Sequence, residues 1–226
     1  MKYIFVSILL LFSLNSSAQE YSCKQLEMDL AAWEQTQNSN NIKWANAIKE
    51  KGIYKMNPDG AIEYVYILNT KDSVNIATIK RLSFDYITYL FNINNATRAN
   101  MEINSPNDGL IYIGNINKVG EFNGMNERNI INAKVLFDIR FKANRIRFSV
   151  KIQGYNVKKW LGGNLIQNYS VLVHNCFPLN PNSNHKKSYA MAFINSNKNC
   201  MMFATGYLIY LNKHLNEKHH TTTDDW

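Results

Sequence analysis

The chain has 226 residues, of which 46% are hydrophobic and 19% charged, and its formal net charge is +8. This composition excludes a disordered or fibrous protein and is typical of one medium globular domain or two small ones. A chain of this length buries about 70% of its unfolded surface, so its core needs neither a metal nor a dense set of disulfides. Three cysteines could not form such a set in any case.

The first 18 residues have the pattern of a signal peptide. Lys2 precedes an apolar run at residues 4–14, and Ser16 and Ala18 are small residues at the minus-three and minus-one positions before Gln19. The run is shorter than the roughly 20 residues that a membrane-spanning helix needs. We therefore expect cleavage after Ala18, and a mature chain that is periplasmic or secreted and has no transmembrane segment.

The predicted export and the basic charge together indicate which class of partner the protein would meet. Removal of Lys2 lowers the formal charge from +8 to +7, so the mature chain remains basic. A basic exported protein meets anionic glycans and lipid head groups before it meets nucleic acid. The charge therefore favours an anionic envelope component as a partner and disfavours nucleic acid.

The three cysteines would enter an oxidising compartment, where one pair could form a disulfide. We favour a disulfide between Cys176 and Cys200, which would leave Cys23 unpaired. The alternative of three buried, reduced thiols stays open, because a sequence does not place sulfur atoms in space.

Residues 19–52 are predicted to form a helical N-terminal extension. Leu26, Leu30 and Trp33 share one helical face after a possible N-cap at Ser22, and a second short helix is expected before Gly52. The main domain is expected at residues 53–215, followed by a polar tail at residues 216–226.

The main domain begins with a strand and a helix. Alternating residues predict a strand at 61–68, after a turn at Pro58-Asp59-Gly60. Residues 74–91 predict an amphipathic helix with a buried stripe of Ile79, Leu82, Tyr86 and Leu90. Strands at 99–104 and 110–119 then form a hairpin, and residues 120–132 are expected to be a polar connection.

The clearest pattern is a second hairpin, formed by residues 133–141 and 145–155. Apolar residues alternate with polar ones in both strands, and the short connection at 142–144 keeps the two apolar sets on one side. The opposite side carries a single acid, Asp138. Its basic residues are Lys134, Arg140, Arg145, Arg147 and Lys151. This face is either a docking surface or an ordinary solvated face.

The last third of the domain is less regular. A short strand-like run at residues 170–173 precedes a long polar loop, and a helical pattern begins at Ser188. An apolar stripe there consists of Met201, Ala204, Leu208, Leu211 and Leu215. Residues 195–199 are rich in asparagine and predict a division into two helices.

The order of elements is strand, helix, four antiparallel strands and helix, which is the α+β order of the TATA-binding-protein-like (TBP-like) fold. Residues 61–155 resemble an exported bacterial family of domains of unknown function with this fold. The resemblance depends on the strand and helix at 62–91, the sequence NDGLIYIG at 107–114 and RIRFSV at 145–150. It implies a curved antiparallel sheet packed on helices, although the family's usual tryptophan in the first helix is replaced here by Tyr86 or a neighbour. No catalytic residue comes with this family.

The residues themselves predict neither an enzyme nor a metal site nor a cofactor. His174 and Cys176 are close in sequence, but a nucleophilic dyad needs spatial contact and an orienting third group. The other histidines lack metal-binding spacing. Two functions follow: an envelope interaction module that uses the basic face, or a binding protein for a small apolar ligand. Such a ligand would lie between the sheet and the C-terminal helix, lined by aromatic residues and by Met191, Met201 and Met202.

Overall fold

The structure is a computed structural model, and it describes residues 19–70, 75–93, 102–104, 109–142 and 145–216. The predicted signal peptide, the tail from residue 217 and the start of the predicted strand at 99–104 lie outside these residues. Within the described ranges, no helix combines the length and the apolar character that crossing a membrane requires.

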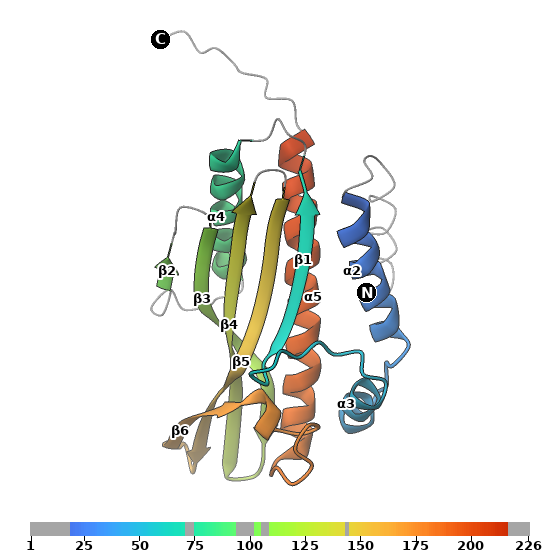
Figure 1. Cartoon of the computed structure of the whole chain (residues 1–226). Helices are drawn as coiled ribbons and strands as arrows, with labels where there is room; N and C mark the ends of the chain where they lie inside the picture. The colour runs from blue at the N-terminus through green and yellow to red at the C-terminus, as the bar shows by residue number, and fades with distance from the viewer. Residues whose placement is uncertain (1–18, 71–74, 94–101, 105–108, 143–144, 217–226) are drawn as a thin grey trace.

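One antiparallel sheet packs with one face against helices, so the architecture is α+β as predicted (Figure 1). The helices are α2 (Gln19–Glu34), α3 (Asn41–Glu50), α4 (Ile76–Ile93), the 3-10 turn η3 (Val173–Asn175) and α5 (Lys186–Asn216). The strands are β1 (Ile62–Asn69), β2 (Glu102–Asn104), β3 (Gly109–Asn123), β4 (Glu127–Lys142), β5 (Arg145–Leu161) and β6 (Asn164–Leu172).

The sheet has the order β1-β5-β4-β3-β2, and β6 pairs with β5 outside this path. β6 includes the start of the strand-like run predicted at 170–173 and begins earlier, at Asn164. β5 is long enough to pair twice along one edge. Its residues 145–152 pair with β1, and its residues 154–161 pair with β6. The sheet therefore extends past the end of β1, and its lower half in Figure 1 consists of β3, β4, β5 and β6.

The register of the β4–β5 hairpin is the predicted one. Phe137 lies opposite Val150 and Ile139 lies opposite Phe148, and all four side chains are buried toward the helices. The Phe148 ring stacks on Tyr207 of α5 with ring centroids 4.4 Å apart. The predicted apolar faces are thus confirmed, because a period of two leaves the opposite side chains on the other face.

The prediction of a polar connection at residues 120–132 is wrong. These residues form the end of β3 and the start of β4, with Gly120 opposite Ile131 and Asn123 opposite Arg128. Val119 and Ile131 still face the core and are buried. The asparagines around them resemble a loop in the sequence because the strands here carry polar residues on the solvent face.

The prediction that residues 195–199 divide the last helix is also wrong, because α5 is continuous over 31 residues. Its polar side chains find partners in the surrounding elements. Asn197 is fully buried and accepts a hydrogen bond from the Tyr64 hydroxyl, and Asn195 donates to the Val119 carbonyl at 2.8 Å. Because these asparagines have hydrogen-bond partners in other elements, they can lie inside a continuous helix. Here asparagine indicates contacts with the sheet and not the end of a helix.

The N-terminal extension is part of the common core. Leu26 and Trp33 of α2 and Ala45 and Ile48 of α3 are buried in the same apolar cluster as the sheet. Asp29 also ties α2 to β1, since its Oδ2 atom accepts hydrogen bonds from Lys55 Nζ at 2.8 Å and from the Tyr66 hydroxyl at 2.9 Å.

The predicted disulfide between Cys176 and Cys200 is not formed, and both residues are buried free thiols. The two thiols come from different elements. Cys176 follows η3 and donates to the Leu172 carbonyl at 3.4 Å, whereas Cys200 lies in the interior of α5. Burial raises the pKa of the Cys176 thiol to about 12, so it stays protonated at neutral pH.

Candidate functional site

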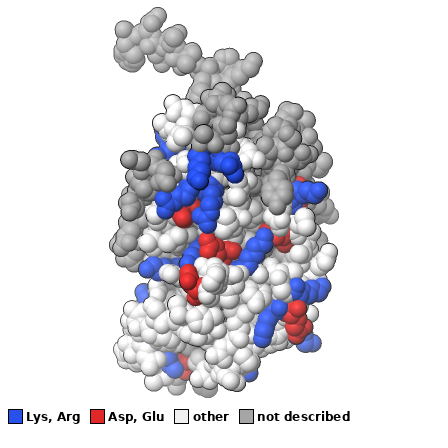
Figure 2. All heavy atoms as spheres, in the orientation of Figure 1, with Lys and Arg blue, Asp and Glu red and all other residues white. Residues whose placement is uncertain are grey.

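The candidate site is the face of the sheet opposite to the helices, which we call the outer face. Because side chains alternate along a strand, every second residue of β4 and β5 points to this face. All five predicted basic residues lie there: Lys134 and Arg145 are exposed, and Arg140, Arg147 and Lys151 are half-buried. Figure 2 shows Lys and Arg side chains gathered over the upper part of this face, with acidic side chains directly below them.

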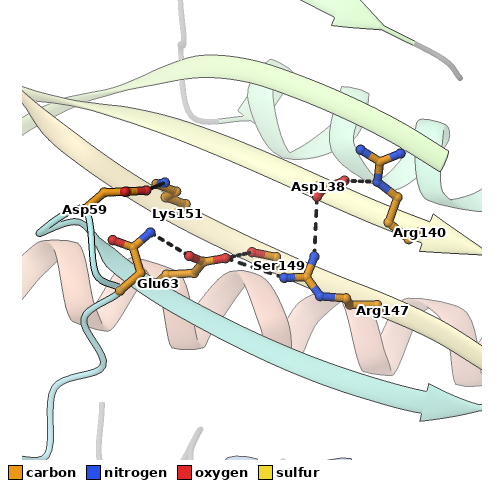
Figure 3. A network of polar contacts seen from close by, with 8 residues as sticks. Asp59, Glu63, Asp138, Arg140, Arg147, Ser149 and Lys151 are labelled. Atoms are coloured by element: carbon orange, nitrogen blue, oxygen red, sulfur yellow. Dashed lines mark hydrogen bonds and ion pairs between the residues drawn. The ribbon is translucent and has the colours of Figure 1, made fainter.

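Most of the predicted cations take part in ion pairs (Figure 3). Asp138 accepts a hydrogen bond from Arg140 Nε at 2.6 Å and a second one from Arg147 Nη1 at 3.4 Å. The other end of the Arg147 guanidinium lies 3.7 Å from Glu63 Oε1. The same oxygen of Glu63 accepts a hydrogen bond from Ser149 at 2.7 Å. The network thus crosses three strands, β4, β5 and β1.

Sequence reasoning missed the acids that β1 and the preceding turn supply. Glu63 belongs to β1, and Asp59 of the turn before it lies 3.1 Å from Lys151 Nζ. An alternating strand with an outward Glu63 was visible in the sequence, but its neighbour in the sheet was not. As a result, the face is less basic around Lys151 and Arg147 than the hairpin alone suggested.

Positive charge remains concentrated at one end of the hairpin. Arg140 lies opposite Arg147 in the register, and Lys142 lies opposite Arg145. We call these four residues the cationic end. Among the described residues, Lys142 and Arg145 have no acidic partner, and Lys134, further along β4, has none either. Two successive cross-strand pairs of like charge are unfavourable for the sheet itself.

The region between the sheet and α5 was the predicted place for an apolar ligand. A cavity of about 300 Å³ lies at one end of this region, among β4, β5, β6, η3 and the loop before α5, with Tyr189 as the lining residue from α5. Its lining is mainly polar and includes Lys159, Gln167, Asn175 and His185.

The three methionines proposed as an adaptable lining do not share one environment. Met201 is buried, Met191 is half-buried and Met202 is 49% exposed, and none of them lines this cavity. The aromatic residues of the core contact one another instead, as Phe137 does with Phe148 and Phe203.

The residues considered for catalysis are not arranged for it. Cys176 is buried and stays protonated, whereas His174 is exposed and packs against Gly60, where φ is +76°. In the part of the chain that the structure describes, no three His, Cys, Asp or Glu side chains are grouped so that they could hold a metal ion.

Comparison with known proteins gives two similar structures. No protein-family model matches the chain, and the curated proteins give no significant match. A DUF4468 family protein from Bacteroides ovatus is similar with a TM-score of 0.43 at 9% identity, over 72% of this chain and 90% of that one. A TBP-like protein from Parabacteroides distasonis is similar with a TM-score of 0.36 at 11% identity, over 72% and 92% of the two chains. Both names agree with the resemblance seen in the sequence, a domain of unknown function and a TBP-like fold.

Proposed function

We propose that the protein is an exported, non-enzymatic interaction module that docks on an anionic envelope component through its cationic end. One observation carries this proposal. Two successive rungs of the β4–β5 hairpin, Arg140 with Arg147 and Lys142 with Arg145, place like charges opposite each other. Asp138 is paired with Arg140 and Arg147, and Glu63 is paired with Arg147, so Lys142 and Arg145 keep no acidic partner among the described residues.

Two features make this end suitable for a partner. The pairing with Asp138 holds Arg140 and Arg147 in fixed positions, so less side-chain entropy is lost when an anion binds. The exposed Lys142 and Arg145 can then supply the attraction. A guanidinium group binds carboxylate, sulfate and phosphate groups with two hydrogen bonds at once, which suits acidic glycans and lipid head groups alike.

The test measures retention of the mature chain, residues 19–226, on immobilised dextran sulfate as a polyanionic probe. We expect Lys142→Glu/Arg145→Glu to weaken binding about tenfold or more at physiological salt, because both substitutions replace attraction by repulsion. Binding of the unaltered protein should also fall steeply as salt rises, since the Debye length shrinks to about 8 Å at ~0.15 M.

A matched control separates this end from net charge. Lys24→Glu/Lys43→Glu makes the same change in charge on exposed residues of α2 and α3, away from the sheet. Retention should stay close to that of the unaltered protein. If both double variants lose retention equally, the attraction is a property of total charge and the proposed docking end is wrong.

A further inference from the structure

A second feature of the outer face lies in the lower half of the sheet, where β6 replaces β1 beside β5. A groove of about 420 Å³ crosses the strands there. Five asparagines from four strands dominate its lining, and they are Asn115, Asn117, Asn132, Asn156 and Asn168. Lys158 is the charged residue of the lining. The groove therefore has a different chemistry from the cationic end.

The register of the sheet builds this groove. Asn132 lies opposite Asn156, and Asn156 lies opposite Ser170 of β6. On the next rung along the face, Lys158 lies opposite Asn168. An irregularity in β3 between Ile116 and Gly120 brings the backbone N–H of Lys118 to Asn132, where it donates a hydrogen bond at 2.8 Å. The amides are thus aligned across the sheet.

The amide groups are only partly used within the protein. The Oδ1 atom of Asn132 accepts from Lys118 N, and that of Asn156 accepts from Ser170 at 2.7 Å. Both bonds leave the side-chain NH2 groups available. Asn115 and Asn168 have no hydrogen-bonded side-chain partner in the described part of the chain. The groove consequently presents amide donors and amide acceptors side by side.

We infer that this groove binds a saccharide chain. Each sugar hydroxyl is both a donor and an acceptor, and a carboxamide offers an oxygen and an NH2 group at a fixed spacing, so asparagines can satisfy hydroxyls in either role. Further along the same face Trp160 lies opposite Arg128, whose guanidinium is 5.9 Å from the indole centre. Trp160 is two residues beyond Lys158 on β5 and lies outside the residues that line the groove, so the proposal depends on the amides.

Other occupants fit less well. A peptide strand would need free backbone groups, but Asn156 of β5 is paired with strands on both sides. Asn132 of β4 is paired with Asn156, and on its β3 side the residues before and after it are paired. An apolar ligand would cover the amides without replacing their bonds to water, which is costly. Nucleic acid would need several phosphate contacts, and Lys158 is a single cation in this lining.

The experiment uses affinity electrophoresis of the mature chain in gels that contain dextran, mannan, xylan or chito-oligosaccharides as probes. At least one of these should retard the protein, with little dependence on salt because the groove is nearly uncharged. Asn115→Ala/Asn168→Ala should weaken that retardation about tenfold or more, which corresponds to loss of about 1.4 kcal/mol of binding. Neither residue has a side-chain partner to lose, so the thermal midpoint should be unchanged.

Two controls decide the interpretation. Asn126→Ala/Asn182→Ala removes two exposed asparagines outside the groove and should leave retardation intact. Lys142→Glu/Arg145→Glu should also leave it intact, so a failure of the cationic end and a failure of the groove are distinguishable. The inference is overturned if no probe retards the protein, if the groove variant binds like the unaltered chain, or if only the cationic-end variant loses binding.

Discussion

At the scale of single residues, buried phenol groups form hydrogen bonds inside the core, and one of them joins β1 to α5. Tyr64 donates to Asn197 Oδ1 at 3.0 Å, and Asn197 in turn donates to the Phe193 carbonyl at 2.8 Å. Both residues are almost completely buried. Burial is the largest cause that raises the pKa of Tyr64, so the phenol keeps its proton and remains a donor.

This pair can be tested by a double-mutant cycle with Tyr64→Phe and Asn197→Ala. We expect Asn197→Ala to lower the free energy of unfolding by about 1–3 kcal/mol, because it leaves a buried hydroxyl without an acceptor. The double variant should lose less than the sum of the two single losses, since it removes both partners together. Urea unfolding of the four proteins measures the coupling.

Ser183→Ala is a suitable control, because its hydroxyl bonds a carbonyl in the partly exposed loop before α5. It should change the free energy of unfolding by about 1 kcal/mol or less. Strict additivity between Tyr64 and Asn197 would show that the bond between them contributes nothing to stability.

At the scale of elements, the two faces of the β4–β5 hairpin have different roles, one in folding stability and the other in the proposed interaction. Its inner face carries rings that pack on α5, and its outer face carries the ion network and the cationic end. A strand can serve both purposes because neighbouring side chains point to opposite sides. Substitutions only three residues apart should therefore differ greatly in their effect on folding.

We expect Phe148→Ala to cost about 3–5 kcal/mol of unfolding free energy, as large-to-small changes in a core do. Arg145→Ala, on the exposed side of the same strand, should change it by only about 0.5 kcal/mol. Denaturant melts of both variants measure the difference. Equal losses would mean that the two faces of β5 have been assigned the wrong way round.

At the scale of the whole molecule, the interior contains many phenol and thiol groups, and burial keeps them protonated. Among the described residues, the buried tyrosines are Tyr64, Tyr66, Tyr86, Tyr112, Tyr155, Tyr189 and Tyr207. Burial raises the pKa of each of them above the ordinary value near 10, and it also raises the pKa of the thiols of Cys176 and Cys200.

This arrangement predicts unfolding in alkali. Above pH ~10 the unfolded chain loses phenol and thiol protons that the folded chain keeps, so the unfolded state binds fewer protons and stability falls as pH rises. The contribution of the phenols is complete below pH ~9 and that of the thiols, whose ordinary pKa is near 9, below pH ~8. Each phenol can remove up to about 1.4 kcal/mol per pH unit above ~10. Exposed tyrosines such as Tyr89 and Tyr169 titrate without unfolding, so only the phenolate absorbance of the seven buried tyrosines should appear together with the loss of circular dichroism. Titration of all 13 phenols without loss of circular dichroism would contradict the buried assignment.

The sequence by itself determined the properties that depend on neighbours along the chain. Alternation in residues 133–155 predicted the hairpin, its register and its buried face, and the stripe around Tyr86 predicted α4. The α+β order followed from these elements. Such features need only the period of a strand or a helix, because the hydrophobic effect buries whichever side is apolar.

The tertiary structure decided every feature that joins distant parts of the chain. Glu63 accepts a hydrogen bond from Ser149, 86 residues away in the chain, and Asn197 accepts one from Tyr64, 133 residues away. The second bond gives a partner to an asparagine that the sequence predicted to lie at a helix break. The asparagine groove and the burial of Cys176 and Cys200 as free thiols also depend on residues that are far apart in the chain. Alternation gives the phase of a strand but not its neighbour, so the partners of these polar groups exist only once the sheet and α5 are packed together.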